Sequence, residues 1–286
     1  MFAKKYLKEN VELIEIEVFS YCNRQCWHCS NSVIDRHSGN TYMSNFIYNK
    51  ILKNLEQINY NKMISFSRYN EPLADKIIYK RLLEARTRIP NALLSLNTNG
   101  DFLDKDVIKK LYDSGLRNLN IQIYMPINSL HEIIESNIIK VLQNLSLDEI
   151  SRTSNKEKIA VNSNYANMNI NIYYRNFCVN GVNRGGIVSK LNKVSNRIAP
   201  CLVPTKGIYI DYNGIIMPCC NLRSDWKEHK KFILGNLNDN NQNLFTIFYN
   251  KKAKAFRELM ASGNLKSYPC NTCLFQREET KCKKSE

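Results

Sequence analysis

Three cysteines stand close together early in the chain, in the stretch Cys22-Asn-Arg-Gln-Cys26-Trp-His-Cys29. A structural zinc ion or a closed iron-sulfur cluster takes four protein ligands, so three thiols in one short loop are one ligand short. The spacing therefore favours a [4Fe-4S] cluster with one iron open to another ligand. A zinc knuckle and an accidental group of thiols are the alternatives, and the sequence downstream is needed to choose between them.

The composition predicts a globular cytoplasmic chain. Its 286 residues, 43% of them hydrophobic, suffice for one large domain or for one and a half. No apolar run approaches the roughly 20 residues that span a bilayer, and the N-terminal residues lack the apolar centre of a signal peptide. We therefore expect a cytoplasmic protein with no membrane partner. In that reducing compartment its 10 cysteines are more readily metal ligands than disulfide partners.

The net charge of +15 admits a nucleic-acid partner or an anionic substrate. Lysine and arginine are scattered along the chain, however, apart from the tail Lys281-Cys-Lys-Lys284. This scatter favours a solvated basic surface over a nucleic-acid site. A zinc-containing nucleic-acid-binding module remains one functional alternative, and it predicts a steep loss of affinity as the salt concentration rises.

Apolar side chains follow strand spacing and helix spacing in turn, which predicts an α/β fold. Strands are expected over residues 11–19, 63–66, 93–96, 119–123 and 168–174. Helices are expected over residues 43–58, 75–85, 104–111 and 129–141. The expected helix signals are caps at Asp75 and Asp104, a capping box of Ser129 with Glu132, and a stop at Gly115. This order predicts a parallel sheet, flat or curled into a partial barrel, with the cysteine loop at the carboxyl end of its first strand.

The composition changes after Pro200, where a small second unit is expected to begin. Asn213 and Gly214 predict the turn of a β-hairpin over residues 208–217. An amphipathic helix is expected over residues 244–260, followed by the last pair of cysteines. The expected domains are residues 1–190 and 191–286.

The cysteine spacing resembles the signature of the radical S-adenosylmethionine (SAM) superfamily. The resemblance implies a partial (β/α) barrel and a [4Fe-4S] cluster held by Cys22, Cys26 and Cys29. It also implies that the amino and carboxylate groups of SAM bind the open iron, with the backbone of His28 near the adenine. An external one-electron reductant, flavodoxin or ferredoxin, is then an expected partner.

Two further motifs stand where this superfamily binds SAM. The first, from Ser67 to Pro72, resembles a segment whose glutamate, here Glu71, binds the methionyl amino group, although Tyr69 and Asn70 replace its two glycines. The second motif follows the third expected strand and resembles a contact to the ribose or the carboxylate. Without the resemblance, both segments predict only surface turns. The SAM-binding residues expected from the two motifs are Asn70, Glu71, Asn97, Thr98 and Asn99.

A second group of thiols lies in the C-terminal unit, at Cys201, Cys219, Cys270 and Cys273. The group resembles the twitch variant of the SPASM domain, which implies a single auxiliary [4Fe-4S] cluster held by these four thiols. A complete SPASM domain has a further cysteine near the position of Glu279. A structural zinc ion is the alternative, since spacing alone does not separate the two metals. Three cysteines are left without a role, and they are Cys178, Cys220 and Cys282.

Segments through most of the chain resemble the SAM-dependent 2-deoxy-scyllo-inosamine dehydrogenase family of butirosin biosynthesis. They are residues 22–33, 70–73, 98–103, 183–187, 201–204 and 218–219. The resemblance implies oxidation of a secondary alcohol of a small aminocyclitol or sugar-like substrate to a ketone, with the auxiliary cluster accepting an electron. It also places Arg184 beside the substrate, where we expect a fixed cation that stabilises a ketyl oxyanion. A salt bridge is the structural alternative for Arg184.

The substrate is not identified by this resemblance, because residues 145–182 are unlike the family and border the expected substrate pocket. Within them, residues 146–167 are rich in asparagine, serine and charge, which predicts a long loop or a short extra strand at 159–161. A peptide-modifying radical SAM enzyme is the second functional alternative. The short stretch before Cys22 argues against an N-terminal leader-peptide recognition domain. We expect a monomer.

Overall fold

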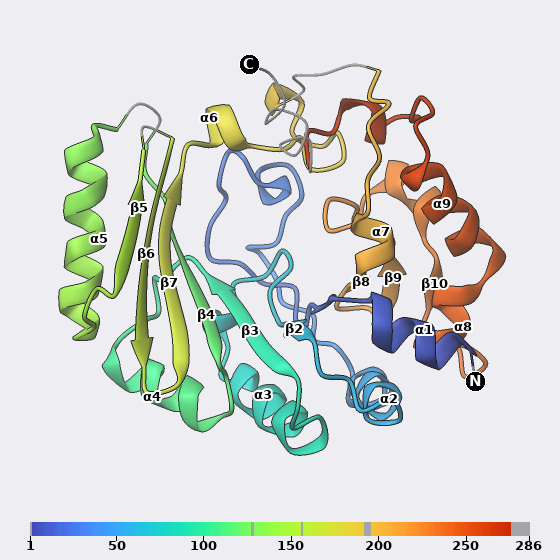
Figure 1. Ribbon diagram of the computed structural model, residues 1–286, viewed down its shortest axis with the longest axis horizontal. Coiled ribbons are helices and arrows are strands. Elements are labelled where there is room, and N and C mark those ends of the chain that lie inside the picture. The colour runs from blue at the N-terminus through green and yellow to red at the C-terminus, as the bar shows by residue number, and fades with distance from the viewer. Residues whose placement is uncertain (1, 127–128, 156, 192–195, 276–286) are drawn as a thin grey trace, which may run out of the picture.

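The computed structural model describes residues 2–126, 129–155, 157–191 and 196–275, which form a ten-stranded sheet flanked by helices (Figure 1). The strands are β1 (Leu13–Ile16), β2 (Met63–Ser65), β3 (Leu93–Thr98), β4 (Asn118–Ile123), β5 (Ser151–Ser154), β6 (Lys158–Tyr165), β7 (Met168–Arg175), β8 (Gly207–Ile210), β9 (Ile215–Met217) and β10 (Gly235–Asn236). The α-helices are α1 (Phe2–Asn10), α2 (Asn45–Glu56), α3 (Ile77–Arg88), α4 (Lys105–Asp113), α5 (His131–Leu145), α6 (Phe177–Asn180), α7 (Val203–Lys206), α8 (Leu244–Tyr249) and α9 (Lys251–Ala261).

The strand order across the sheet is β10-β9-β8-β1-β2-β3-β4-β7-β6-β5. The strands from β8 to β7 in this order run parallel to one another, while β9, β10, β6 and β5 are each antiparallel to their neighbours. In the described part of the chain the outermost strands β10 and β5 do not pair, so the sheet forms an open, partial barrel. The predicted α/β class is confirmed.

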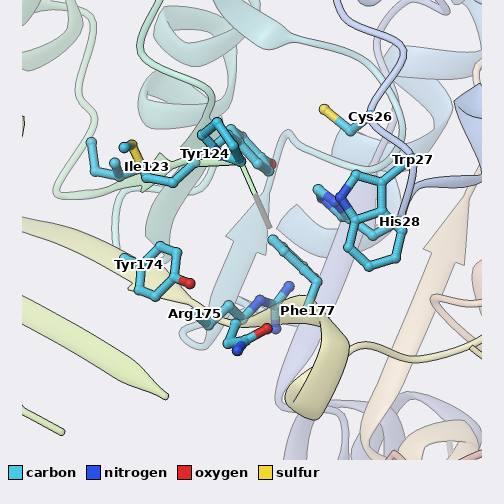
Figure 2. A pocket seen from close by; sticks show the side chains of 11 residues that line it. Cys26, Trp27, His28, Ile123, Tyr124, Tyr174, Arg175 and Phe177 are labelled. Carbon is cyan, nitrogen blue, oxygen red and sulfur yellow. The ribbon is translucent and has the colours of Figure 1, made fainter. Parts of the chain in front are cut away.

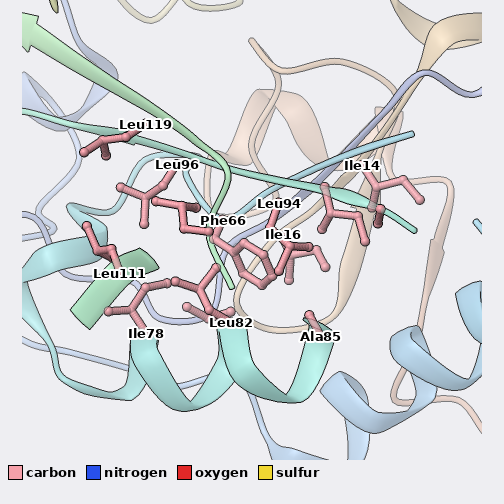
Figure 3. Close-up of a cluster of buried hydrophobic side chains, with 14 of the residues drawn as sticks. Ile14, Ile16, Phe66, Ile78, Leu82, Ala85, Leu94, Leu96, Leu111 and Leu119 are labelled. Carbon is pink, nitrogen blue, oxygen red and sulfur yellow. The ribbon is translucent and has the colours of Figure 1, made fainter. Parts of the chain in front are cut away.

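Apolar side chains from the strands and from the helices beneath them form the main core (Figure 3). Alternation along β1 buries Ile14 and Ile16, and α3 turns Ile78 and Leu82 toward the same core. Parallel strands covered by helices share one direction, so their carboxyl ends meet at one edge of the sheet. The loops that follow β1, β2, β3, β4 and β7 therefore gather at that edge.

The helix boundaries confirm some of the predicted caps and correct one. The Asp104 carboxylate accepts a hydrogen bond from the Val107 amide at 2.7 Å at the start of α4, and Gly115, with φ of 94°, follows its end. Asp75 accepts from the Ile77 amide at 2.9 Å, where α3 begins. The capping box of Ser129 with Glu132 is wrong, because α5 begins only after Leu130 and the Ser129 hydroxyl donates to the Pro126 carbonyl at 2.8 Å instead.

Residues 146–167 contain more strand than the sequence predicted. Strands β5 and β6 form an antiparallel pair beside β7, and β6 is 8 residues long. Only Ile159 and Val161 supply large buried apolar side chains from β6, while Lys158 and Asn162 face outward. Backbone pairing with β7 along the whole of β6 makes up for this weak apolar pattern.

The C-terminal hairpin has the predicted turn, where Gly214 has φ of 79° and its amide donates to the Asp211 carbonyl at 2.8 Å. Its first strand, β8, pairs in parallel with β1, so the hairpin extends the main sheet. The prediction of a single helix over residues 244–260 is wrong, because the structure has two helices there, α8 and α9. Asn250 is extended between α8 and α9, and its side chain accepts from the Ala253 amide at 2.7 Å, which starts a new helix.

No helix among the described residues combines the length and the apolar character needed to span a bilayer. Within the described ranges, five short 3-10 helices position several of the loops discussed below. They are η1 (Ser30–Ser32), η2 (Pro72–Ala74), η3 (Ser189–Leu191), η4 (Lys227–Phe232) and η5 (Cys270–Thr272).

Candidate active site

The cysteine triad lies in the long loop after β1, as the sequence predicted. The amide of Cys22 donates to the Arg36 carbonyl and the amide of Cys29 donates to the Cys26 carbonyl, both at 2.9 Å, so backbone hydrogen bonds shape the loop. Partial burial, with a smaller contribution from the neighbouring thiols, raises the pKa of the Cys22 and Cys26 thiols to about 11. Metal binding deprotonates such thiols directly. Among the described residues, no three His, Cys, Asp or Glu side chains are already arranged around a single metal ion.

The loop after β3 holds this cysteine loop in place. The Asp101 carboxylate accepts from Asn23 and from Arg24 Nε, each at 2.7 Å, and forms a second hydrogen bond with the Arg24 guanidinium. Asn99 donates to the Asn23 side chain at 2.8 Å. Arg24 also lies over the ring of Tyr124, with 5.2 Å from the guanidinium carbon to the ring centre. Charge-assisted pairs of this kind fix loop geometry more firmly than neutral hydrogen bonds do.

Glu71 is the centre of the predicted SAM-binding residues. Its carboxylate is buried and accepts from the Thr98 hydroxyl at 2.7 Å, from the Asn99 amide at 2.8 Å and from the Leu73 amide at 3.1 Å. Burial raises the pKa of Glu71 above its ordinary value, and the hydrogen bonds from these donors offset part of that rise. The structure therefore brings the ends of β2 and β3 together through one carboxylate, which keeps part of its acceptor capacity.

The two remaining asparagines of these motifs differ in their surroundings. Asn70 is buried, and its oxygen accepts from the Arg68 amide at 3.1 Å, while its Nδ2 has no hydrogen-bond partner in the described structure. Asn97 has an exposed side chain, and its backbone amide and carbonyl both bond the Ser67 hydroxyl. Asn70 thus offers a free buried donor, whereas the backbone of Asn97 connects β3 to the loop after β2.

A cavity of about 150 Å³ lies between the cysteine loop and the carboxyl ends of β4 and β7 (Figure 2). The His28 ring stacks on Phe177, with 3.4 Å between ring centres, and on Tyr124 at 5.4 Å. Burial, with the cations Arg184 and Arg175 nearby, lowers the pKa of His28 to about 3, so its ring is neutral near pH 7. Its Nδ1 finds no partner among the described residues. A mostly apolar cavity lined by aromatic rings, with such a polar atom, suits a heteroaromatic ring.

Arg184 lies between the two groups of cysteines. Its Nε is 3.5 Å from the His28 carbonyl oxygen, at the limit of a hydrogen bond. Burial alone would lower the pKa of Arg184, but the surrounding groups have the larger combined effect. The pKa is therefore raised above its ordinary value, and the side chain stays a cation. The groups that favour this charge belong to Cys29, Tyr69, Cys220 and Tyr124. The salt bridge considered from the sequence is not found for Arg184 among the described residues.

The four cysteines of the second group also share one region of the fold. Cys270 is the first residue of η5 and Cys273 directly follows it, and burial together with the thiols of Cys273 and Cys201 raises the pKa of Cys270 to about 12. The Asn221 amide donates to the Cys219 sulfur at 3.4 Å. Cys220, which the sequence left without a role, lies in the same group of thiols. Glu279 and Cys282 lie outside the described residues.

Sequence reasoning missed the residues that connect the two cysteine groups. The Tyr69 hydroxyl donates to the Cys220 carbonyl at 2.6 Å, and the Tyr69 carbonyl accepts from Asn31 at 2.8 Å. The guanidinium of Arg223 donates to Ser30 at 2.7 Å and to Asn31 at 2.8 Å, two residues that directly follow the triad. The signal for Tyr69 was its place in a motif that usually has glycine there. No comparable signal marked Arg223.

Comparison with known families follows the same division of the chain. A model of the Radical SAM superfamily matches residues 16–184. The chain belongs to the radical SAM superfamily. This radical SAM enzyme therefore uses a [4Fe-4S] cluster and SAM, as the sequence predicted. A second model, SPASM, described as an iron-sulfur cluster-binding domain, matches residues 201–274, so the C-terminal segment corresponds to an auxiliary iron-sulfur unit.

Individual relatives agree with this assignment. The chain is 28% identical over 262 residues to the S-adenosyl-L-methionine-dependent 2-deoxy-scyllo-inosamine dehydrogenase of Niallia circulans, covering 91% of this chain and 92% of that protein. The fold is similar to that of BtrN crystallised with AdoMet and 2-DOIA, with a TM-score of 0.66, 24% identity and coverage of 88% of both chains. It is also similar to BtrN in an open conformation, with a TM-score of 0.57, 22% identity and coverage of 89% and 87%.

Proposed function

We propose that this radical SAM enzyme oxidises a secondary alcohol of a small polar molecule, an aminocyclitol or a sugar-like compound, to a ketone. The observation that carries the proposal is the position of Arg184, a partly buried cation near both cysteine groups. Its Nε lies 3.5 Å from the carbonyl oxygen of His28, the residue before Cys29, and the next residue, Gly185, packs against the carbonyl of Asn221, the residue after Cys220. A substrate oxygen next to this cation would lie within reach of both groups. The similarity to a dehydrogenase of aminocyclitols supports the same reaction.

The residues of the two cysteine groups fit two clusters. Cys22, Cys26 and Cys29 would hold the first and leave one iron open, while Cys201, Cys219, Cys270 and Cys273 would hold a single auxiliary cluster. When bound, the first cluster would supply the electron for reductive cleavage of SAM, which provides a radical able to take a hydrogen atom from the alcohol carbon, and the auxiliary cluster would supply an acceptor for the second electron. The protein's own part is to position SAM and the alcohol.

SAM binding is proposed for the residues that surround the triad. The free acceptor capacity of Glu71 and the unpartnered Nδ2 of Asn70 suit the ammonium and carboxylate of the methionyl group. Thr98 and Asn99 hold Glu71, and Asn97 stands exposed beside them for the ribose or the carboxylate. His28, in the aromatic cavity, is proposed to lie near the adenine, and the size and apolar lining of that cavity support this placement.

Arg184 is proposed to act on the substrate oxygen as a fixed cation. A guanidinium keeps its proton throughout the accessible pH range, and the surroundings of Arg184 raise its pKa further, so it is a poor base. A positive charge that is already in place stabilises an oxygen on which negative charge develops, as it does on a ketyl. The hydroxyl proton would then leave through water or a neighbouring group.

Replacing Glu71 with glutamine is expected to weaken SAM binding. A hydrogen bond to a charged group contributes about 1.5 to 3 kcal/mol, so Glu71→Gln should raise the dissociation constant about ten- to a hundredfold in equilibrium binding. The matched control is Thr98→Val, which removes one hydrogen bond to Glu71 but keeps its charge and should cost less than about tenfold. If Glu71→Gln binds SAM with unchanged affinity, Glu71 does not contact SAM and its role is limited to capping η2.

Several properties of the working enzyme complete the proposal. We propose an external one-electron donor of the flavodoxin or ferredoxin type, and the net charge of +15 suits an acidic carrier of this kind. The protein is proposed to act as a cytoplasmic monomer with a radical SAM core over residues 1–190 and an auxiliary-cluster unit over 191–286. The separate matches to residues 16–184 and 201–274 support this division.

Turnover of a panel of candidate substrates tests the proposed reaction. Reconstituted enzyme would be incubated with SAM, a reductant and individual aminocyclitols or sugars, and 5′-deoxyadenosine and ketone would be measured together. The proposal predicts that at least one aminocyclitol or sugar gives both products in equal amounts. Ketone-free reactions across this panel, with deoxyadenosine release stimulated by a precursor peptide instead, would favour the peptide-modifying alternative and overturn the proposal.

A further inference from the structure

The turn that carries Arg184 has three consecutive residues in the left-handed region, with φ of 52° at Arg184, 68° at Gly185 and 89° at Gly186. Glycine adopts this backbone freely, whereas the Cβ of an arginine crowds the neighbouring carbonyl oxygen. A side chain persists in such a conformation where the surrounding structure holds it. The neighbours of this turn therefore decide where the Arg184 guanidinium lies.

His229, on η4, forms a hydrogen bond to the backbone of the turn from a distant part of the chain. It is 1% exposed, and its Nε2 lies 2.8 Å from the Gly185 carbonyl oxygen. Its Nδ1 accepts a hydrogen bond from the Arg223 amide at 3.1 Å. Because a backbone amide can only donate, Nδ1 must be unprotonated and Nε2 must carry the proton that it donates to Gly185. Both hydrogen bonds are thus made by one tautomer of a neutral ring.

The ring of His229 is also in close contact with the turn. A Cβ added to Gly185 would lie 2.7 Å from the His229 Cε1 atom and 2.6 Å from the Asn221 carbonyl oxygen, so only glycine fits at this position. On the inner side, the Gly186 amide donates to the Asn183 carbonyl at 3.0 Å. The turn is therefore held by a backbone hydrogen bond of its own, from Gly186 to Asn183, and by the side-chain hydrogen bond from His229 to the Gly185 carbonyl.

We propose that His229 is a positioning residue which, as the neutral Nε2-protonated tautomer, holds the left-handed turn at Gly185 and so aims the Arg184 guanidinium at the substrate oxygen. The role rests on the proposed function, in which Arg184 stabilises the ketyl. Through the Arg223 amide, the same ring connects this turn to the segment after Cys219 and Cys220. Arg184 would thereby keep one place relative to both cysteine groups.

Two variants of similar size separate positioning through Gly185 from a general structural role. The amide nitrogen of glutamine can take the place of Nε2, so His229→Gln keeps a donor for the Gly185 carbonyl and loses the acceptor for Arg223. The amide oxygen of asparagine can take the place of Nδ1, so His229→Asn keeps the acceptor and loses the donor. Each variant retains one of the two hydrogen bonds, so a merely structural role predicts equal defects.

The readouts are ketone formed per 5′-deoxyadenosine, iron content, and hydrogen-deuterium exchange in the reconstituted enzyme. Exchange is followed at the Gly186 and Val188 amides, which both donate to the Asn183 carbonyl at 3.0 Å and so report on the turn. We expect His229→Asn to lower the ketone ratio about tenfold with iron content unchanged, and His229→Gln to lower it less than about threefold, in line with loss or retention of one buried hydrogen bond. Exchange at both amides should be faster in the Asn variant. Equal ratios and equal exchange in the two variants would overturn the inference.

The outcome also distinguishes this inference from the proposed function. If the wild-type enzyme forms no ketone but exchange is faster in His229→Asn than in His229→Gln, His229 holds the turn and the alcohol oxidation is wrong. If the wild-type enzyme forms ketone and the two variants are alike in both readouts, the oxidation stands and the positioning role is wrong.

Discussion

Replacing Cys22, Cys26 and Cys29 together with alanine should abolish SAM cleavage completely. The three thiols are the only protein ligands proposed for the first cluster, and SAM is not reduced without it. If both sites hold [4Fe-4S] clusters, the reconstituted wild-type chain carries about eight irons and the triple variant about four. Iron analysis and chromatography of 5′-deoxyadenosine measure the two effects.

The second cysteine group supplies the matched control. Alanine at Cys201, Cys219, Cys270 and Cys273 should also leave about four irons, but these belong to the first cluster and still cleave SAM. Cys220→Ala, which changes a neighbouring thiol outside the proposed ligand set, should keep all of the iron. Tightly bound zinc in the second site would contradict the auxiliary cluster, and loss of both clusters from the quadruple variant would show that this site is needed for folding.

Replacing Arg184 with lysine is expected to uncouple radical formation from ketone formation. Lysine keeps the charge and has the same Cβ in the left-handed backbone, so the change isolates the planar guanidinium. Product formation should fall at least about tenfold, the equivalent of about 1.4 kcal/mol, while SAM binding persists. Because hydrogen abstraction precedes proton loss, 5′-deoxyadenosine should accumulate without ketone. Product formation should fall further in Arg184→Gln, because this change also removes the positive charge.

A structural role for Arg184 predicts a different result. If Arg184 only holds its loop, through the bond of its side chain to the His28 carbonyl at 3.5 Å, the lysine ammonium can donate a comparable hydrogen bond, and Arg184→Lys would be nearly silent in both products. Equal amounts of ketone and deoxyadenosine at the wild-type rate would remove Arg184 from the chemistry. Chromatographic assay of both products in the same reaction decides between the two roles.

Features with short-range causes could be predicted from the sequence. The triad depends on the spacing between Cys22 and Cys29, and the cap at Asp104 depends on an amide three residues away. The alternation of strand and helix likewise follows from local apolar periodicity. These features gave the α/β class and the position of the cysteine loop, whereas the shared site of Glu71 and the end of β3 was implied only by the resemblance to the superfamily.

Features with long-range causes could not be predicted. Tyr69 departs from the usual glycine of its motif because its hydroxyl bonds the carbonyl of Cys220, 151 positions away. Strand β6 has few apolar residues and is stabilised by pairing with β7. The place of His229 against Gly185 depends on a contact between residues 44 positions apart, so neither residue carries a local signal.

Transfer of deuterium from the alcohol carbon to 5′-deoxyadenosine tests the central proposal most directly. An aminocyclitol, beginning with 2-deoxy-scyllo-inosamine deuterated at its carbinol carbons, would be turned over with unlabelled SAM and analysed by mass spectrometry. The proposal predicts deoxyadenosine carrying one deuterium and an equal amount of ketone. Labelled deoxyadenosine accompanied by a product that is still an alcohol, or ketone accompanied by unlabelled deoxyadenosine, would contradict it.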